Sequence, residues 1–177
     1  NGRHNALTLF NTDQILFSKL LCDRNGVILH ANGFEINNRG FLLAGHSGAG
    51  KSTLSKMLTR QGLEILCDDR MLVKKEKNFT IYGSWCHGSV PKTRNASAPL
   101  NAIFFLNQSE DNRIRELTDS KQISTKLINA LVKPFLGRED WAKTLAIIDS
   151  LRQNVRYYDL FFDLSGEICN QITARLK

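Results

Sequence analysis

One short glycine-rich segment constrains this chain more than any other feature. Gly45-His46-Ser47-Gly48-Ala49-Gly50-Lys51-Ser52 follows the apolar run 41–44 and precedes Leu54, Met57 and Leu58, which recur at helical spacing. The pattern Gly-x-x-x-x-Gly-Lys-Ser between a strand and a helix is typical of a P-loop. The sequence therefore predicts an α/β fold in which this loop joins a strand to a helix.

The residue types in this loop suit the binding of a polyphosphate. Glycines let backbone N–H groups turn inward, and the helix N-terminus adds partial positive charge. We expect Lys51 to reach the β- and γ-phosphate oxygens and Ser52 to ligate Mg²⁺. His46 is expected to point away from the phosphates, and Thr53 is a neighbour of the metal ligand. The predicted cofactor-binding residues are Gly45, His46, Ser47, Gly48, Ala49, Gly50, Lys51, Ser52 and Thr53.

Length and composition limit the organisation of the chain. With 177 residues, 42% of them hydrophobic, we expect a single domain over residues 1–177. No run approaches the roughly 20 apolar residues of a membrane span, so we expect a cytoplasmic protein without a membrane partner. The net charge of +7 suits an anionic ligand or an acidic protein partner. Nucleic acid is disfavoured because the basic residues are scattered.

Hydrophobic patterning predicts a mixed sheet with helices. An Asn-rich turn at 37–40 separates apolar runs and predicts a hairpin over 27–44. Further strands are expected at 63–67, 71–73, 79–82, 102–106 and 158–162, with helical patterning at 118–156 and, more weakly, at 7–22. The exposed edges of such a sheet would permit pairing, so a homo-oligomer is left open.

Two adjacent carboxylates follow the strand expected after the P-loop helix. In a parallel βαβ unit, Asp68 and Asp69 would emerge at the same sheet edge as the phosphate loop. One could serve Mg²⁺ and the other could accept a proton from a hydroxyl. The alternative is that Asp-Asp only begins a turn. His30, on a neighbouring strand, could orient a carboxylate or be a core histidine.

The polar segment 84–99 is long for a connection in a compact domain, and such segments are often substrate loops. Lys92 and Arg94 could bring an extra cation to a transferring phosphoryl group. They could equally be surface charges on a loop.

Together, residues 30–40, the loop 45–52 and Cys67-Asp68-Asp69-Arg70 resemble the catalytic domain of HPr kinase/phosphorylase. The resemblance covers about residues 27–165 and leaves 1–26 unassigned. It implies a phosphoenolpyruvate carboxykinase-like P-loop fold and phosphorylation of a serine hydroxyl by ATP with Mg²⁺. It also implies Asp68 as general base, Asp69 and Ser52 as metal-side ligands, and His30 as a supporting residue. The family's Gly-rich substrate segment is replaced here by 84–99, which argues against HPr itself as the acceptor.

These observations give one leading hypothesis and two alternatives. The first is ATP-dependent, Mg²⁺-assisted phosphoryl transfer to a hydroxyl, on a protein or peptide serine, with Asp68, Lys51, His30 and Arg94 as catalytic residues. The second is a nucleotide-sensing module that binds without transfer. The third is small-molecule kinase or phosphorylase chemistry on the same scaffold. ATP is favoured over GTP by the resemblance alone.

Overall fold

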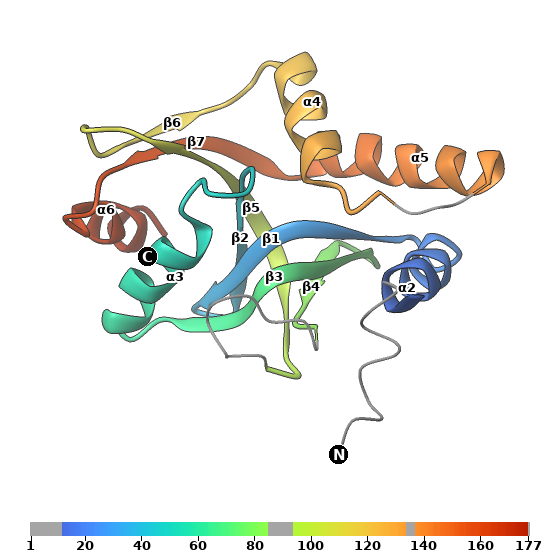
Figure 1. The fold of residues 1–177 in the computed structure, drawn as a ribbon, viewed down its shortest axis with the longest axis horizontal. Helices are drawn as coiled ribbons and strands as arrows, with labels where there is room; N and C mark the ends of the chain where they lie inside the picture. The colour runs from blue at the N-terminus through green and yellow to red at the C-terminus, as the bar shows by residue number, and fades with distance from the viewer. Residues whose placement is uncertain (1–11, 85–93, 134–136, 177) are drawn as a thin grey trace.

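The computed structural model describes residues 12–84, 94–133 and 137–176. The described helices are α2 (Thr12–Cys22), α3 (Lys51–Arg60), α4 (Ser120–Ala130), α5 (Arg138–Asn154) and α6 (Glu167–Leu176). The strands are β1 (Gly26–Ile36), β2 (Arg39–Ala44), β3 (Glu64–Lys75), β4 (Phe79–Tyr82), β5 (Ser97–Gln108), β6 (Arg113–Glu116) and β7 (Arg156–Phe162). Figure 1 shows their arrangement.

The predicted hairpin before the loop is confirmed. Asn37 and Asn38 form its turn with φ of 52° and 58°, and Ile36 pairs with Arg39 across it. Two successive positive φ values define a type I′ turn, which asparagine tolerates better than most residues. β1 is one continuous strand rather than two short ones. The hairpin therefore delivers β2, and the loop that follows it, against a long supporting strand.

β3 differs from the prediction. Asp68 and Asp69 do not end a strand or begin a turn, because β3 continues through them to Lys75. They pair with Asn32 and Ala31 in an antiparallel ladder. A buried carboxylate is tolerated in a strand when a neighbouring polar group satisfies it, and Asn32 does so for Asp68. The local sequence favours a turn at Asp-Asp, and the partner strand overrides it.

The sheet is mixed, as predicted, with the strand order β2-β1-β3-β4-β5-β7-β6 and an additional pairing of β2 with β5. β5 runs parallel to both β2 and β7. β1 is antiparallel to β2 and to β3, so β2 and β3 point the same way with β1 between them. The predicted βαβ unit is therefore corrected, because its two strands are parallel but not adjacent.

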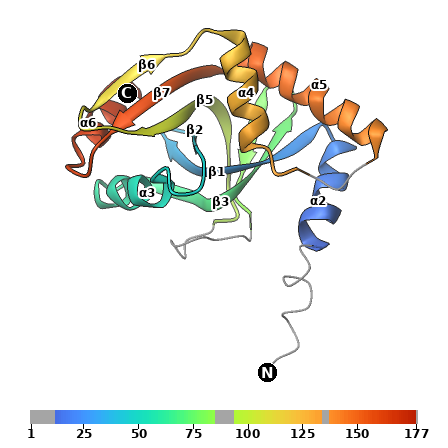
Figure 2. The same ribbon diagram turned by 45° about the horizontal axis from the view of Figure 1, so that its top comes forward.

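Helices cover both faces of the sheet (Figure 2). α4 and α5 pack on one core, with Ile123, Leu127 and Ile148 among its buried residues. α3 and α6 pack on the other core, where Phe34, Phe41, Phe104 and Tyr158 form a row of rings with successive centroids 5.3, 6.3 and 5.3 Å apart. Burying each such ring contributes about 1.5–3 kcal/mol relative to leaving it exposed. The two cores therefore hold the sheet from both faces at the end where the strands lead into the loop.

The helical region predicted at 118–156 is confirmed as α4 and α5, and Asp119 caps α4 by accepting hydrogen bonds from the backbone N–H groups of Lys121 and Gln122. The predicted strand at 158–162 is found within β7, and the weak helix prediction near the start is met by α2. β6 and α6 were not predicted. No helix in the described ranges is long and apolar enough to cross a membrane.

Candidate functional site

The glycine-rich loop, residues 45–50, lies where sequence analysis placed it. β2 ends at Ala44 and α3 begins at Lys51, with Gly50 as the residue before the first turn. The Leu54 N–H donates to the Gly50 carbonyl at 2.9 Å, which closes that first turn. The loop thus sits at the carboxyl end of β2, next to a helix N-terminus with its partial positive charge.

Two glycines of the loop have backbone conformations that other residues adopt at a cost. Gly48 has φ of 81° and Gly50 has φ of 96°. A Cβ at Gly48 would meet no atom within 4 Å, whereas one at Gly50 would lie 2.6 Å from Cζ of Phe162. Gly50 is therefore required for two reasons, its conformation and its contact with the end of β7.

Hydrogen bonds from three parts of the chain hold the loop. The Ala49 N–H donates to the His46 carbonyl at 3.1 Å, and Gln108 Nε2 at the end of β5 donates to the Gly48 carbonyl at 2.8 Å. Lys51 Nζ donates to the Gly45 and His46 carbonyls at 2.8 and 3.1 Å. The ammonium group is therefore folded back over the loop itself.

Lys51 is buried, unlike most lysines. Burial lowers the pKa of its ammonium group below the ordinary value, and the charges of Asp69 and Asp68 act in the opposite direction. The lysine thus stands between a desolvating loop and two carboxylates of β3. This arrangement brings the loop and the acidic pair into one site, as the sequence predicted.

Asp68, Asn32 and Ser55 are buried, and they form a polar cluster with the half-buried Ser52. Asn32 Nδ2 donates to Asp68 Oδ1 and, at 2.8 Å, to Ser55 Oγ. Ser52 Oγ donates to Asp68 Oδ2 at 3.2 Å. With Asp68 only 1% exposed, these bonds fix the orientation of the carboxylate relative to the first turn of α3.

Asp69 has different partners. His30 Nδ1 lies 3.1 Å from Asp69 Oδ1 and also 3.1 Å from the Asp69 carbonyl oxygen. Arg70 Nε lies 3.3 Å from Asp69 Oδ2. The hydrogen bond with His30 is the main cause that lowers the pKa of Asp69, against a smaller opposing effect of burial. Asp69 is therefore ionised near neutral pH and keeps 27% of its side chain exposed.

The predicted catalytic role of Arg94 is corrected by its position in the structure. The Arg94 guanidinium pairs with Glu64, the first residue of β3, and the backbone N–H of Arg94 donates to the Leu66 carbonyl at 2.9 Å. In the sheet, Glu64 pairs with Glu35, and Glu35 pairs with Gly40 near the start of β2. The loop follows the other end of β2, so Arg94 lies at the opposite end of these strands from the loop. The charge of Glu64 attracts it there. Lys92 lies outside the described residues.

The remaining predicted residues stay at the loop. His46 and Ser47 are exposed, Ala49 is buried, and Thr53 is exposed on the first turn of α3. His46 Nδ1 lies 2.6 Å from the Ser47 carbonyl oxygen.

Sequence analysis missed three polar residues of the site. Asn107 and Gln108 follow the buried run 102–106 at the carboxyl end of β5, beside the loop. Their position after an apolar strand is a pattern that could have identified them, since parallel strands end at a common edge. Asn32 lies inside β1, and no feature of the local sequence marks it.

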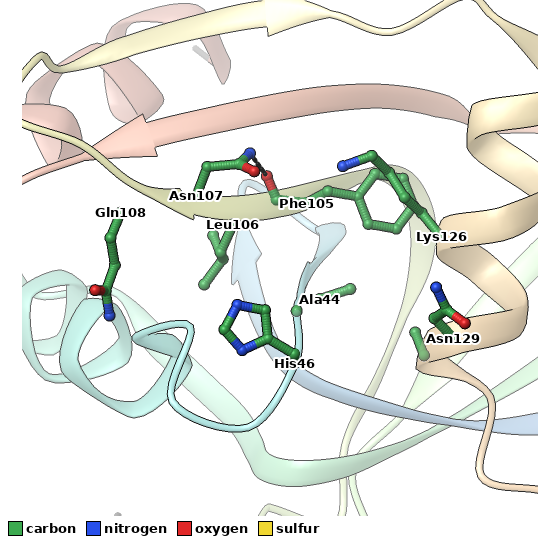
Figure 3. A pocket seen from close by; sticks show the side chains of 10 residues that line it. Ala44, His46, Phe105, Leu106, Asn107, Gln108, Lys126 and Asn129 are labelled. Atoms are coloured by element: carbon green, nitrogen blue, oxygen red, sulfur yellow. Dashed lines mark hydrogen bonds between the residues drawn. The ribbon is translucent and has the colours of Figure 1, made fainter.

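A pocket of about 720 Å³ adjoins the start of the loop. Figure 3 shows His46 on one side, Asn107 and Gln108 along β5, and Lys126 and Asn129 on α4. Ala44, Leu106 and Ala130 supply apolar lining. The site thus has two flanks: Asp68 and Asp69 on the β3 side, and this pocket on the β5 side.

These features define a mixed α/β protein with a glycine-rich loop and two carboxylates at one region of its sheet. The chain belongs to the family described as "SynChlorMet cassette protein ScmC", whose model matches residues 4–177. No curated protein matches it. Among solved structures it is similar to the Hpr(Ser) kinase/phosphatase from Coxiella burnetii, with 14% identity, a TM-score of 0.46, and coverage of 84% of this chain and 97% of that one.

Proposed function

We propose that this protein is a kinase that transfers the γ-phosphoryl group of ATP, with Mg²⁺, to a hydroxyl group, most readily a serine of a protein or peptide. The observation that carries the proposal is the contact of Ser52 Oγ with Asp68 Oδ2 at 3.2 Å, directly beside Lys51. A hydroxyl, a carboxylate and a lysine at the end of a glycine-rich loop are the groups that a metal–nucleotide complex requires.

Ser52 and Asp68 fit Mg²⁺ by their chemistry. Mg²⁺ prefers hard oxygen ligands, takes few of them from the protein, and keeps several waters. A hydroxyl and a carboxylate already close to each other match that requirement. Ser52 and Asp68 would hold the ion, whose positive charge would neutralise charge on the bound phosphates. Asn32 holds the carboxylate in place through the hydrogen bond to its other oxygen.

The loop and Lys51 would hold the phosphate chain. Backbone N–H groups of 45–50 and the start of α3 attract an anion. The Lys51 ammonium donates to loop carbonyls here, and it can exchange these neutral acceptors for phosphate oxygens, which are stronger acceptors because they are charged.

The two aspartates exchange the roles that the family resemblance implies. Asp68 is buried and bonded to Ser52, so we assign it to the metal. Asp69 is more exposed and is oriented by His30, so we assign it to the acceptor hydroxyl. A lowered pKa suits this role, because phosphoryl transfer chiefly needs an ionised carboxylate that orients the hydroxyl and accepts its proton late.

The test incubates the protein with γ-labelled ATP, Mg²⁺ and a lysate of its source organism, and follows transfer of label to protein or peptide. We expect label in wild type and in Lys56→Ala, whose lysine is exposed on the same helix. Lys51→Ala and Asp69→Asn should abolish it, the latter without loss of ATP binding. ATP binding without any labelled acceptor would favour the nucleotide-sensing module instead.

A further inference from the structure

The pocket beside the loop lies at a reversal in the chain topology. After β2 the chain forms α3 on one face of the sheet, and after β5 it proceeds through β6 to α4 and α5 on the other face. β2 and β5 are neighbouring parallel strands. In open α/β sheets, ligands bind outside the carboxyl ends of strands at such a switch point. The pocket occupies this place, and Ala44 of β2 and Phe105 of β5 are among its lining residues.

The pocket lining suits a flat heterocycle. Ala44, Leu106 and Ala130 offer apolar surface, and amide side chains surround it. Asn107 Nδ2 donates to the Phe105 carbonyl at 3.1 Å, which leaves its Oδ1 available as an acceptor (Figure 3). The exposed amide of Asn129, on α4, also lines the pocket. Such amides pair well with a purine edge that carries a donor and an acceptor.

The charges of the pocket also fit a nucleoside attached to phosphates. Lys126 Nζ lies 3.1 Å from Asp159 Oδ1 and 5.3 Å from the centre of the Phe105 ring. Asp159 does not line the pocket, and its Oδ2 also lies 2.7 Å from Nη2 of Arg115, so Lys126, Asp159 and Arg115 together carry net positive charge next to the pocket. None of the residues that line the pocket in the described ranges is acidic.

The two sides of the loop would then hold different parts of the nucleotide, the phosphates on one side and the nucleoside on the other. Ser52 and Asp68 lie on the β3 side, where the metal-bound β- and γ-phosphates are assigned, whereas the pocket opens on the β5 side. We propose that this pocket binds the purine nucleoside of the nucleotide, with Asn129 and Asn107 contacting the base. This inference rests on the proposed function, because it requires phosphates in the loop.

The experiment compares two ligands in the presence of Mg²⁺, ATP and inorganic tripolyphosphate, by titration calorimetry. Asn129→Ala should weaken ATP binding about fivefold, the effect of one hydrogen bond, and leave tripolyphosphate binding unchanged. Asn129 is exposed on α4. The indole ring of Asn129→Trp should occupy the pocket and abolish ATP binding, and tripolyphosphate binding should be unchanged. Asn154→Ala, an exposed asparagine at the end of α5, is the matched control.

Each other outcome has a defined meaning. The nucleoside assignment is overturned if both Asn129 variants bind ATP like wild type, or if they lose both ligands equally. Unchanged binding with reduced phosphoryl transfer would make the pocket an acceptor site and overturn it as well. Failure of the proposed function would look different: Lys51→Ala would then bind tripolyphosphate as tightly as wild type.

Discussion

Replacing Gly48 and Gly50 separately by alanine tests the geometry of the loop. Both residues have positive φ, 81° and 96°, and an alanine in a left-handed conformation costs about 1–2 kcal/mol. At Gly48 that is the whole cost, because no atom lies within 4 Å of the added Cβ. At Gly50 the methyl would lie 2.6 Å from Cζ of Phe162, and such overpacking adds about 1–3 kcal/mol. We therefore expect losses of about 1–2 and about 2–5 kcal/mol.

Urea denaturation followed by circular dichroism measures this difference. With a slope of about 2 kcal/mol per molar urea, the extra cost at Gly50 lowers the midpoint by about 1 M relative to Gly48→Ala. The double variant Gly50→Ala/Phe162→Leu should be less destabilised than the sum of its two single variants. The reasoning is refuted if Gly48→Ala costs as much as Gly50→Ala, or if the Phe162 change gives no relief.

Two further predictions concern the acidic residues of the sheet. Asp159→Asn should lower the unfolding free energy by ~2 kcal/mol, which is less than the roughly 3–5 kcal/mol expected for a fully buried pair because Arg115 is 63% exposed. Asp149→Asn, at the exposed pair with Arg152, should lower it by under about 0.5 kcal/mol. Equal effects of the two substitutions in urea denaturation would contradict this prediction. The pKa of Asp69 is lowered on folding, so its contribution to stability is present above the ordinary value of 3.8 and is lost as pH falls through the lower folded value. The Asp69→Asn variant should thus be less stable than wild type at neutral pH, and the difference in unfolding free energy should be smaller below pH 3.8. If this difference does not shrink on acidification, the His30–Asp69 interaction is excluded as its source.

Sequence patterns predicted the elements whose signals are local. The turn at Asn37-Asn38 needs two positive φ values, which its residues tolerate, and the glycine spacing of 45–50 marks a loop before a helix. Long apolar runs such as 102–106 identify buried strands without any knowledge of their partners. The sequence alone therefore predicts that the loop and the acidic pair lie in one region of the fold.

Other features depend on contacts far apart in the sequence. The continuation of β3 through Asp68 relies on Asn32, which lies 36 residues earlier. Arg94 could be drawn either to phosphate or to an acid, and only the fold places Glu64 beside it. β6 has four residues, too few for a periodic pattern, and its position depends on pairing with β7. The pocket at α4 likewise requires the topology of β2 and β5.

The effect of Mg²⁺ on ATP affinity tests the central claim most directly, because that claim places a metal–nucleotide complex at Ser52 and Asp68. Calorimetric titrations with and without Mg²⁺ would compare wild type with Asp68→Asn. We predict that Mg²⁺ strengthens wild-type ATP binding by at least about tenfold, or about 1.4 kcal/mol, and that Asp68→Asn removes this gain. Absence of ATP binding, or an affinity that Mg²⁺ does not change in wild type, would contradict the account.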